Sequence, residues 1–299
     1  MNETDWLAER FEAHRGHLRA VAYRMLGSLA EADDAVQDVW LRLSRSGTEN
    51  VENLGGWLTT IVARVCLNVL RSRQVRREES LDAHVPDPVI SRADGVDPEH
   101  EALLADSVGL ALYVVLDTLT PAERLAFVLH DMFDVPFDEI APMVGRSPDA
   151  ARQLASRARR RVRGSAPVPD ADVTRQRELV NAFFAAARRG DFEALVAVLD
   201  PDAVMRSDGG AARPGLSQVV RGATAIAGRA ITFAQPSAVL RPALMKGAAV
   251  VVVTVGREPV SVMGFTVTAG KIVEIDVVAD PDRLRRLDLA GMRLPADKP

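Results

Sequence analysis

Hydrophobic positions in residues 5–46 recur at intervals of three and four, the spacing of amphipathic helices. Phe11, Leu18 and Met25 lie inward on one predicted helix, which ends at Gly27. Ser28 and Glu31 then have the spacing of a capping box, so a second helix begins there. Its inward stripe consists of Ala32, Val36, Val39 and Leu43. Its polar faces include Asp34, Gln37 and Asp38, with the two aspartates one turn apart.

Residues 56–77 form a third helical pattern, and it is basic. Its apolar stripe consists of Trp57, Leu58, Ile61, Val62, Val65 and Val69. It has no acidic residue and five arginines: Arg64, Arg71, Arg73, Arg76 and Arg77. Phosphate is the expected counter-charge, and Asn68 between the arginines can hydrogen-bond to a base edge. The alternative for this segment alone is a solvated basic helix without a partner.

Residues 134–163 have the pattern of a helix-turn-helix. Ile140 and Val144 precede Gly145, and Ser147 caps a second helix with Pro148 at its first position. Because Pro142 removes a backbone hydrogen bond, we expect the first helix to be short. The second helix has an inward stripe of Ala151, Leu154, Ala155, Ala158 and Val162. Its outward residues are Asp149, Arg152, Gln153, Ser156, Arg160 and Arg163.

The pattern changes from helices to strands after residue 172. Helices are expected at 173–189, from Gly190-Asp191 onward, and at 219–233, with a short strand at 203–206 between them. Four longer strands follow at 237–245, 248–256, 259–268 and 271–278. Ala269-Gly270 joins the last two as a hairpin. Helices followed by a strand meander predict an α+β sheet domain.

Segments rich in proline or acidic residues separate these patterns. The 299 residues are 47% hydrophobic, enough for more than one core. Residues 78–106 contain nine acids and one arginine, whereas residues 146–163 contain seven arginines and one acid. We therefore predict a multidomain chain of two all-α domains, the second with the helix-turn-helix, and an α+β domain. The predicted ranges are an all-α domain 1–77, an acidic linker 78–100, an all-α domain 101–165 and an α+β domain 172–299.

Composition limits the compartment and the chemistry. Cys66 is the only cysteine, so no internal disulfide can form. The N-terminal segment is acidic rather than basic, and no apolar run approaches the length of a membrane span. We therefore expect a cytoplasmic protein without a membrane segment. The five histidines have no metal-ligand spacing with the cysteine, so we expect neither a metal nor a cofactor.

Residues 1–165 resemble a bacterial RNA polymerase sigma factor of the extracytoplasmic-function (ECF) group. The run Ala30 to Leu43 is similar to the segment of that group that contacts polymerase, and Gly56-Trp57-Leu58 through Arg77 to the segment that melts and recognises the -10 element. Residues 134–163 are similar to its -35-binding segment. The resemblance implies that Asp34, Gln37 and Asp38 contact the polymerase clamp. The resemblance also implies two sets of DNA-binding residues. The -10 element is bound by Arg64, Asn68, Arg71, Arg73, Arg76 and Arg77. The -35 element is bound by Asp149, Arg152, Gln153, Ser156, Arg160 and Arg163.

Residues 172–299 resemble the SnoaL-like domain, of NTF2 fold, that is fused to one subgroup of these factors. Two short motifs of that subgroup are present in altered form, at 208–213 and 280–284. We expect a non-catalytic domain that regulates the sigma domains through these two segments. The residues concerned are Asp208, Gly209, Gly210, Arg213, Asp280, Asp282 and Arg283. Whether a small ligand enters the cone of this domain stays open.

Two other functions are compatible with parts of the chain. A ligand-responsive helix-turn-helix regulator would use residues 134–163 but would leave residues 1–77 without a role. A SnoaL-type enzyme would use the cone, but all His, Tyr, Trp and Cys residues precede position 131. Acid–base catalysis there would depend on carboxylates alone, with Asp208, Glu274 and Asp276 as candidate bases. Phe183, Phe184, Phe192 and Phe265 could line a ligand cavity or pack the core.

Overall fold

The computed structural model describes residues 3–46, 53–77, 85–88, 115–165, 170, 172–245, 248–256 and 258–287. Their contacts divide the chain into two compact units. The first unit contains residues 3–77 and 115–165, and the second contains residues 85–88 and the described residues from 170 to 287. Within the described residues, no helix is long and apolar enough to cross a membrane.

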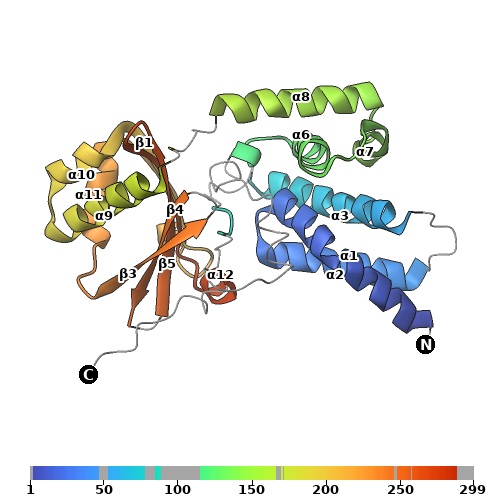
Figure 1. Cartoon of the computed structure of the whole chain (residues 1–299), viewed down its shortest axis with the longest axis horizontal. Coiled ribbons are helices and arrows are strands. Elements are labelled where there is room, and N and C mark those ends of the chain that lie inside the picture. The colour runs from blue at the N-terminus through green and yellow to red at the C-terminus, as the bar shows by residue number, and fades with distance from the viewer. Residues whose placement is uncertain are drawn as a thin grey trace. The chain divides into compact units, whose positions relative to one another are not determined.

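The first unit begins with three packed helices, α1 (Glu3–Leu26), α2 (Leu29–Ser46) and α3 (Leu54–Arg77) (Figure 1). Gly27 adopts a left-handed φ of 71° and donates to the Tyr23 carbonyl, which ends α1. The Ser28 hydroxyl accepts from the Glu31 amide and caps α2, as its sequence predicts. The shared core includes fully buried Leu18, Val39 and Leu58.

Four further elements follow in the described part of this unit: α6 (Pro121–Phe127), a π-helical turn (Val128–Met132), α7 (Phe137–Val144) and α8 (Pro148–Ser165). Thr120 and Glu123 form the complete capping box of α6. Gly145, at φ 66°, ends α7 and turns the chain into α8. The predicted helix-turn-helix is therefore confirmed, including the short α7 that carries Pro142.

The second unit is a six-stranded sheet with helices α9 (Val173–Arg189), α10 (Phe192–Val198) and α11 (Ala223–Phe233) grouped on one side (Figure 1). The strands are β1 (Leu199–Asp208), β2 (Gln218–Arg221), β3 (Ala238–Met245), β4 (Ala248–Val255), β5 (Glu258–Thr268) and β6 (Lys271–Val278), in the order β2-β1-β6-β5-β4-β3. Only the β1–β6 pair of this sheet is parallel. Phe183, Ile226 and Phe265 are in the core between helices and sheet, and α12 (Pro281–Arg286) follows β6. The expected α+β sheet domain is confirmed.

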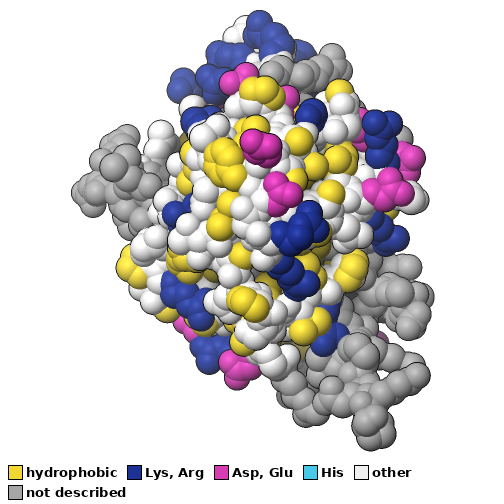
Figure 2. All heavy atoms as spheres, turned by 90° about the vertical axis from the view of Figure 1, so that its left-hand side faces the viewer, with side chains coloured by type: hydrophobic (Ala, Val, Ile, Leu, Met, Phe, Trp, Pro, Cys, Tyr) yellow, Lys and Arg dark blue, Asp and Glu magenta, His cyan; other side chains and the backbone are white. Residues whose placement is uncertain are grey.

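Two predicted elements of this unit need correction. Residues 219–221 belong to strand β2 and not to the start of a helix, because Val219 and Val220 pair with β1 and Gly222, at φ 89°, separates them from α11. The strand predicted at 203–206 extends over Leu199–Asp208, since β1 has neighbours on both sides. Figure 2 shows the helix side of this unit, where basic and hydrophobic side chains are interspersed.

Candidate functional site

The acidic surface of α2 is exposed. Asp34, Gln37 and Asp38 are all solvent-accessible, while Ala35, Val36 and Val39 on the opposite side of the helix are buried. Asp33 differs from its neighbours because it accepts a 2.6 Å hydrogen bond from Arg19 of α1. Among the described residues, Asp34 and Asp38 form no ion pair, so their carboxylates are available to a cationic partner.

The basic face of α3 presents Arg64, Asn68 and Arg71 to solvent at intervals of four and three residues. Arg73 lies differently: it forms an ion pair with Glu31 and donates a 2.8 Å hydrogen bond to the Leu26 carbonyl. These contacts attach the end of α3 to the α1–α2 junction. Arg76 and Arg77 belong to the last turn of α3, but their side chains lie outside the described residues.

The outward face of α8 carries the side chains that the helix-turn-helix pattern predicts. Asp149, Arg152, Gln153 and Arg160 are exposed and Ser156 is half-buried. Arg152 is oriented by a 2.5 Å ion pair with Asp149, and its guanidinium lies 5.4 Å from the centre of the Phe137 ring. The side chain of Arg163 lies outside the described residues.

Other arginines of α8 hold the helix in place, a role that sequence reasoning missed. Arg157 and Arg161 both contact the Glu123 carboxylate, at 3.2 and 2.8 Å, and Arg159 pairs with Asp131 at 2.8 Å. Burial favours a raised pKa for Glu123, but hydrogen bonds from Thr120 and the charges of Arg161 and Arg157 outweigh it and lower that pKa. The spacing of four between Arg157 and Arg161 was the available signal, since it places them on one side of the helix.

Buried arginines join the two helical parts of the first unit. Arg124 of α6 pairs with Asp117 and donates to the Arg24 carbonyl of α1 at 3.4 Å. The Arg24 guanidinium lies 4.8 Å from the centre of the Phe133 ring. Burial raises the pKa of the nearby Cys66 thiol to about 12, which makes it a packed and unreactive thiol. Residues 3–77 and 115–165 therefore pack together through α3 and α6.

In the second unit, Arg283 collects contacts from residues far apart in the sequence. Its Nε donates to Asp87 Oδ1 at 2.5 Å, its Nη1 donates to Asp208 Oδ2 at 2.6 Å, and its Nη2 donates to the Val85 carbonyl. Asp208 also accepts from the Val85 amide at 3.3 Å. We call these four residues, Val85, Asp87, Asp208 and Arg283, the Arg283 cluster. It attaches the described part of the predicted acidic linker, residues 85–88, to the sheet domain.

The remaining residues of the two predicted regulatory segments support this cluster or lie beside it. Gly210 has a φ of 61°, and a Cβ there would come within 2.1 Å of the Asp280 carboxylate. A Cβ on Gly209 would meet the Arg213 carbonyl at 2.2 Å, so only glycine allows this close turn. Arg213 donates to the Ala279 carbonyl at 3.3 Å, and Asp280 caps α12. Asp282 is exposed and pairs only locally, with Arg285.

A cavity of about 240 Å³ lies between the helices and the concave face of the sheet. Most of its lining is apolar, including Phe183, Phe184, Met205 and Met263. Three arginines line it (Arg188, Arg213 and Arg229), and no carboxylate of the described part of the chain does. Phe192 is not part of the lining and is 41% exposed, whereas Phe265 packs against Phe183 in the core.

None of the three candidate catalytic carboxylates lines this cavity. Arg206 pairs with Glu274 at 3.1 Å and with Asp276 at 3.4 Å. Arg206 and Asp276 alternate along their strands with the cavity-lining Met205, Ser207 and Val277, so this trio lies on the other face of the sheet. Burial raises the pKa of Asp276 to about 7, despite the opposing charge of Arg206 and with a further increase from Glu274. Asp208 belongs to the Arg283 cluster.

Comparisons with known proteins agree with this division. The model of sigma-70 region 2 matches residues 10–76, and that of sigma-70 region 4 matches residues 109–162. The probable ECF RNA polymerase sigma factor SigI of Mycobacterium tuberculosis is 34% identical over 294 residues, which cover 97% of this chain and all of SigI. The ECF sigma factor SigJ of the same species is 41% identical over 213 residues, covering 71% of this chain and 68% of SigJ.

A crystal structure of M. tuberculosis SigJ superposes with a TM-score of 0.71 at 33% sequence identity, covering 94% of this chain and 99% of that one. Two sigma-70 regions, joined to an α+β domain, thus define the class as an RNA polymerase sigma factor with a fused C-terminal domain. The chain belongs to the ECF family of these factors.

Proposed function

We propose that this sigma factor uses the exposed faces of three helices for three contacts in promoter-specific initiation. Asp34, Gln37 and Asp38 of α2 contact the polymerase clamp. Arg64, Asn68 and Arg71 of α3, with Arg76 and Arg77 at its end, bind the -10 element. The outward residues of α8, from Asp149 to Arg163, bind the -35 element. The proposal places the protein in the cytoplasm, with polymerase and DNA as partners.

One observation carries this assignment: each helix buries one side and leaves the proposed contact residues accessible on another. Val36 of α2, Leu58 of α3 and Ala155 of α8 are almost fully buried, whereas Asp34, Asn68 and Arg152 are exposed. Surface side chains on rigid helices are suited to binding a large partner with little loss of conformational entropy. Arg73 is the exception, since its contacts with Glu31 and Leu26 favour a supporting role for it.

The C-terminal domain regulates the sigma regions through the linker in this proposal. Residues 85–88 lie in the sequence between the region 2 and region 4 matches, so a domain that holds them limits how far the two regions can separate. The Arg283 cluster supplies that attachment, and the Gly209-Gly210 turn with Asp280 and Arg213 supports it. Asp282, which pairs locally, has no direct part in holding the linker.

Catalysis by the C-terminal domain is not part of the proposal. No carboxylate of the described residues lines its cavity, and the sequence supplies no His, Tyr or Cys after residue 130. General acid–base chemistry therefore lacks a group that could reach a molecule in the cavity.

The test is transcription reconstituted from purified chain, bacterial core polymerase and genomic promoter fragments, with transcript starts mapped. A sigma factor gives defined starts that depend on both the chain and the core enzyme. A ligand-responsive regulator, the second candidate, would bind an operator without polymerase and would not confer start sites on the core enzyme. The chain ended after Ala166 measures the contribution of the C-terminal domain: equal starts and yields at every promoter would contradict its regulatory role.

A further inference from the structure

The cavity of the C-terminal domain is mostly apolar, but its lining also carries positive charge. Three arginines border it, and among the residues that the structure describes no acidic side chain does. A cavity that arose only from imperfect packing is expected to have an apolar lining, because a charge without a counter-charge beside it costs free energy. The imbalance points to an occupant that carries negative charge.

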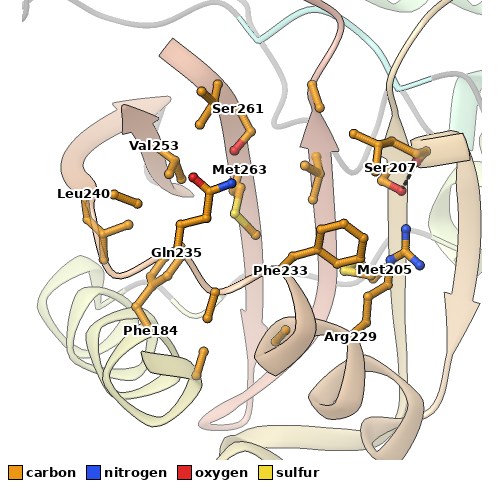
Figure 3. Close-up of a pocket in the computed structure, with 18 of the residues that line it drawn as sticks. Phe184, Met205, Ser207, Arg229, Phe233, Gln235, Leu240, Val253, Ser261 and Met263 are labelled. Carbon is orange, nitrogen blue, oxygen red and sulfur yellow. Dashed lines mark hydrogen bonds between the residues drawn. The ribbon is translucent and has the colours of Figure 1, made fainter. Parts of the chain in front are cut away.

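Arg229 of α11 is the cation best placed to meet such an occupant. It is half-buried, and among the described residues no carboxylate pairs with it. Its guanidinium lies 4.7 Å from the centre of the Phe233 ring, and Figure 3 shows it on the side of Met205 and Ser207. Burial lowers the pKa of Arg229, so its charge is poorly solvated and would gain from an anionic partner.

The rest of the cavity determines the size and polarity of the molecule that fits. The volume of about 240 Å³ is below the range of about 300 to 1,000 Å³ typical of pockets for drug-sized ligands. Figure 3 shows the Gln235 amide on the side of Ser261 and Met263, with the Phe233 ring between Gln235 and Arg229. Phe233 lines the cavity and is 54% exposed, so it lies where the cavity opens to solvent. One aromatic ring or a short acyl chain with a single charged group fills such a space.

We propose that this cavity binds a small monocarboxylate with an apolar body, its carboxylate held by Arg229 and its body between Phe184, Met205 and Met263. Phosphorylated or multiply charged ligands fit less well, because Arg188 and Arg213 already donate to the carbonyls of Ala238 and Ala279. A neutral ligand of the same shape binds less tightly, since it leaves the half-buried guanidinium of Arg229 without a counter-charge.

The site lies next to the Arg283 cluster within the same unit, which gives binding a route to the linker. Arg213 and Ala279 both line the cavity, and Arg213 donates to the Ala279 carbonyl. The Ala279 amide in turn donates to the Asp208 carbonyl at 2.7 Å, and the Asp208 carboxylate holds Arg283. A ligand that moves Arg213 would thus reach the linker attachment through two hydrogen bonds and one ion pair.

Isothermal titration calorimetry on the full-length chain tests the binding site without polymerase or DNA, so its outcome is independent of the proposed function. The probes are octanoate, phenylacetate and, as the neutral match, octanol. We expect saturable binding of one carboxylate per chain and weaker binding of octanol. Arg229→Gln should weaken carboxylate binding about 10- to 100-fold, the usual effect of losing a hydrogen bond to a charged group. Arg229→Lys should retain part of the affinity.

Two further variants make the result decisive. Arg177→Gln makes the same change at an exposed position of α9 outside the cavity and should leave binding unchanged. Ala230→Phe places a ring in the cavity and should abolish binding while thermal unfolding shows the fold to be intact. The proposal is overturned if neither carboxylate binds saturably, or if binding survives both Arg229→Gln and Ala230→Phe undiminished.

Discussion

The fold alters the protonation of Asp276. It is 2% exposed, and burial raises its pKa from the ordinary value of 3.8 to about 7. At pH values between 3.8 and about 7, Asp276 therefore keeps a proton in the folded protein that it has released in the unfolded chain. The contribution of Asp276 to the free energy of unfolding is complete below pH 3.8 and is lost as pH rises through about 7.

Asp276→Asn removes this titration and retains the side-chain shape. We expect the free energy of unfolding of the unaltered protein to decrease relative to the variant as pH rises from 5 to 7, with a slope of up to about 1.4 kcal/mol per pH unit. Urea unfolding at several pH values measures both curves. Parallel curves would show that Asp276 ionises normally in the folded state.

Arg283 gives the second prediction at this scale, because its three partners are largely buried. Removing one member of a buried ion pair costs about 3 to 5 kcal/mol. Arg283→Ala should therefore lower the stability of the second unit and expose the Val85 amide, which donates to Asp208. Hydrogen exchange at Val85 measures the release of the linker directly.

Arg285→Ala is the matched control on the same helix. Arg285 is 76% exposed and pairs with Asp282 within one turn, so its loss should change stability by no more than about 0.5 kcal/mol. Equal protection of Val85 in the two variants would mean that Arg283 does not hold the linker.

At the scale of elements, the arginines of α8 fall into two groups. Arg157 and Arg161 contact Glu123, whereas Arg152 and Arg160 are exposed and do not. Arg152, near the N-terminus of the helix, is placed for base contacts, whereas Arg160 is placed for phosphate. Arg152→Ala should cost about 1 to 3 kcal/mol on the specific -35 sequence and relax sequence preference.

Arg160→Ala should instead weaken binding to all sequences alike. It should also reduce the slope of log affinity against log salt concentration by about one. Titrations of specific and random duplexes at several salt concentrations measure both effects. Equal losses on the two duplexes for Arg152→Ala would contradict its assignment as a base contact.

Helix α3 provides the corresponding prediction for the -10 element. Asn68 is exposed between Arg64 and Arg71, so Asn68→Ala should reduce open-complex formation more than closed-complex binding. Permanganate footprinting of the melted strand measures this step, with Asn181→Ala on an exposed turn of α9 as the control. A footprint as strong as that of the unaltered protein would remove Asn68 from the -10 contact.

The elements also show which features could be predicted from the sequence. The Ser28 cap, the Gly145 turn and the Ala269-Gly270 hairpin depend on residues within a few positions, and each was predicted correctly. Strand β2 was missed because Val219 and Val220 gain their partners from β1, which a local pattern cannot indicate. The ion pairs of Glu123 were missed because Arg157 and Arg161 lie 34 and 38 residues further along the chain.

The same limit applies to the candidate sites. Exposed faces of α2, α3 and α8 follow from helical periodicity, so their residues could be chosen in advance. Arg283 was identified through a motif, but its partner Asp87 lies 196 residues away and carries no local signal of that contact. Arg229 was not anticipated, because a cavity forms only when α11 packs over the sheet.

At the scale of the whole molecule, the two units have different roles in the proposed function. In that proposal the first unit presents the surfaces for polymerase and promoter, and the second holds the linker and encloses the cavity. A sigma factor of this kind can be regulated within one chain, since occupancy of the second unit can alter the restraint on the first. These proposed roles depend on the binding of core polymerase through α2.

Charge reversal on α2 is the most direct test of that claim. The double variant Asp34→Lys with Asp38→Lys is compared with Glu193→Lys plus Asp202→Lys, an equal charge change at exposed positions of the second unit. Affinity for purified core polymerase is measured for each, with thermal unfolding as the check on folding. The account predicts that the α2 variant folds normally but loses core binding, whereas the control binds as the unaltered protein does. Undiminished core affinity in a folded α2 variant would contradict it.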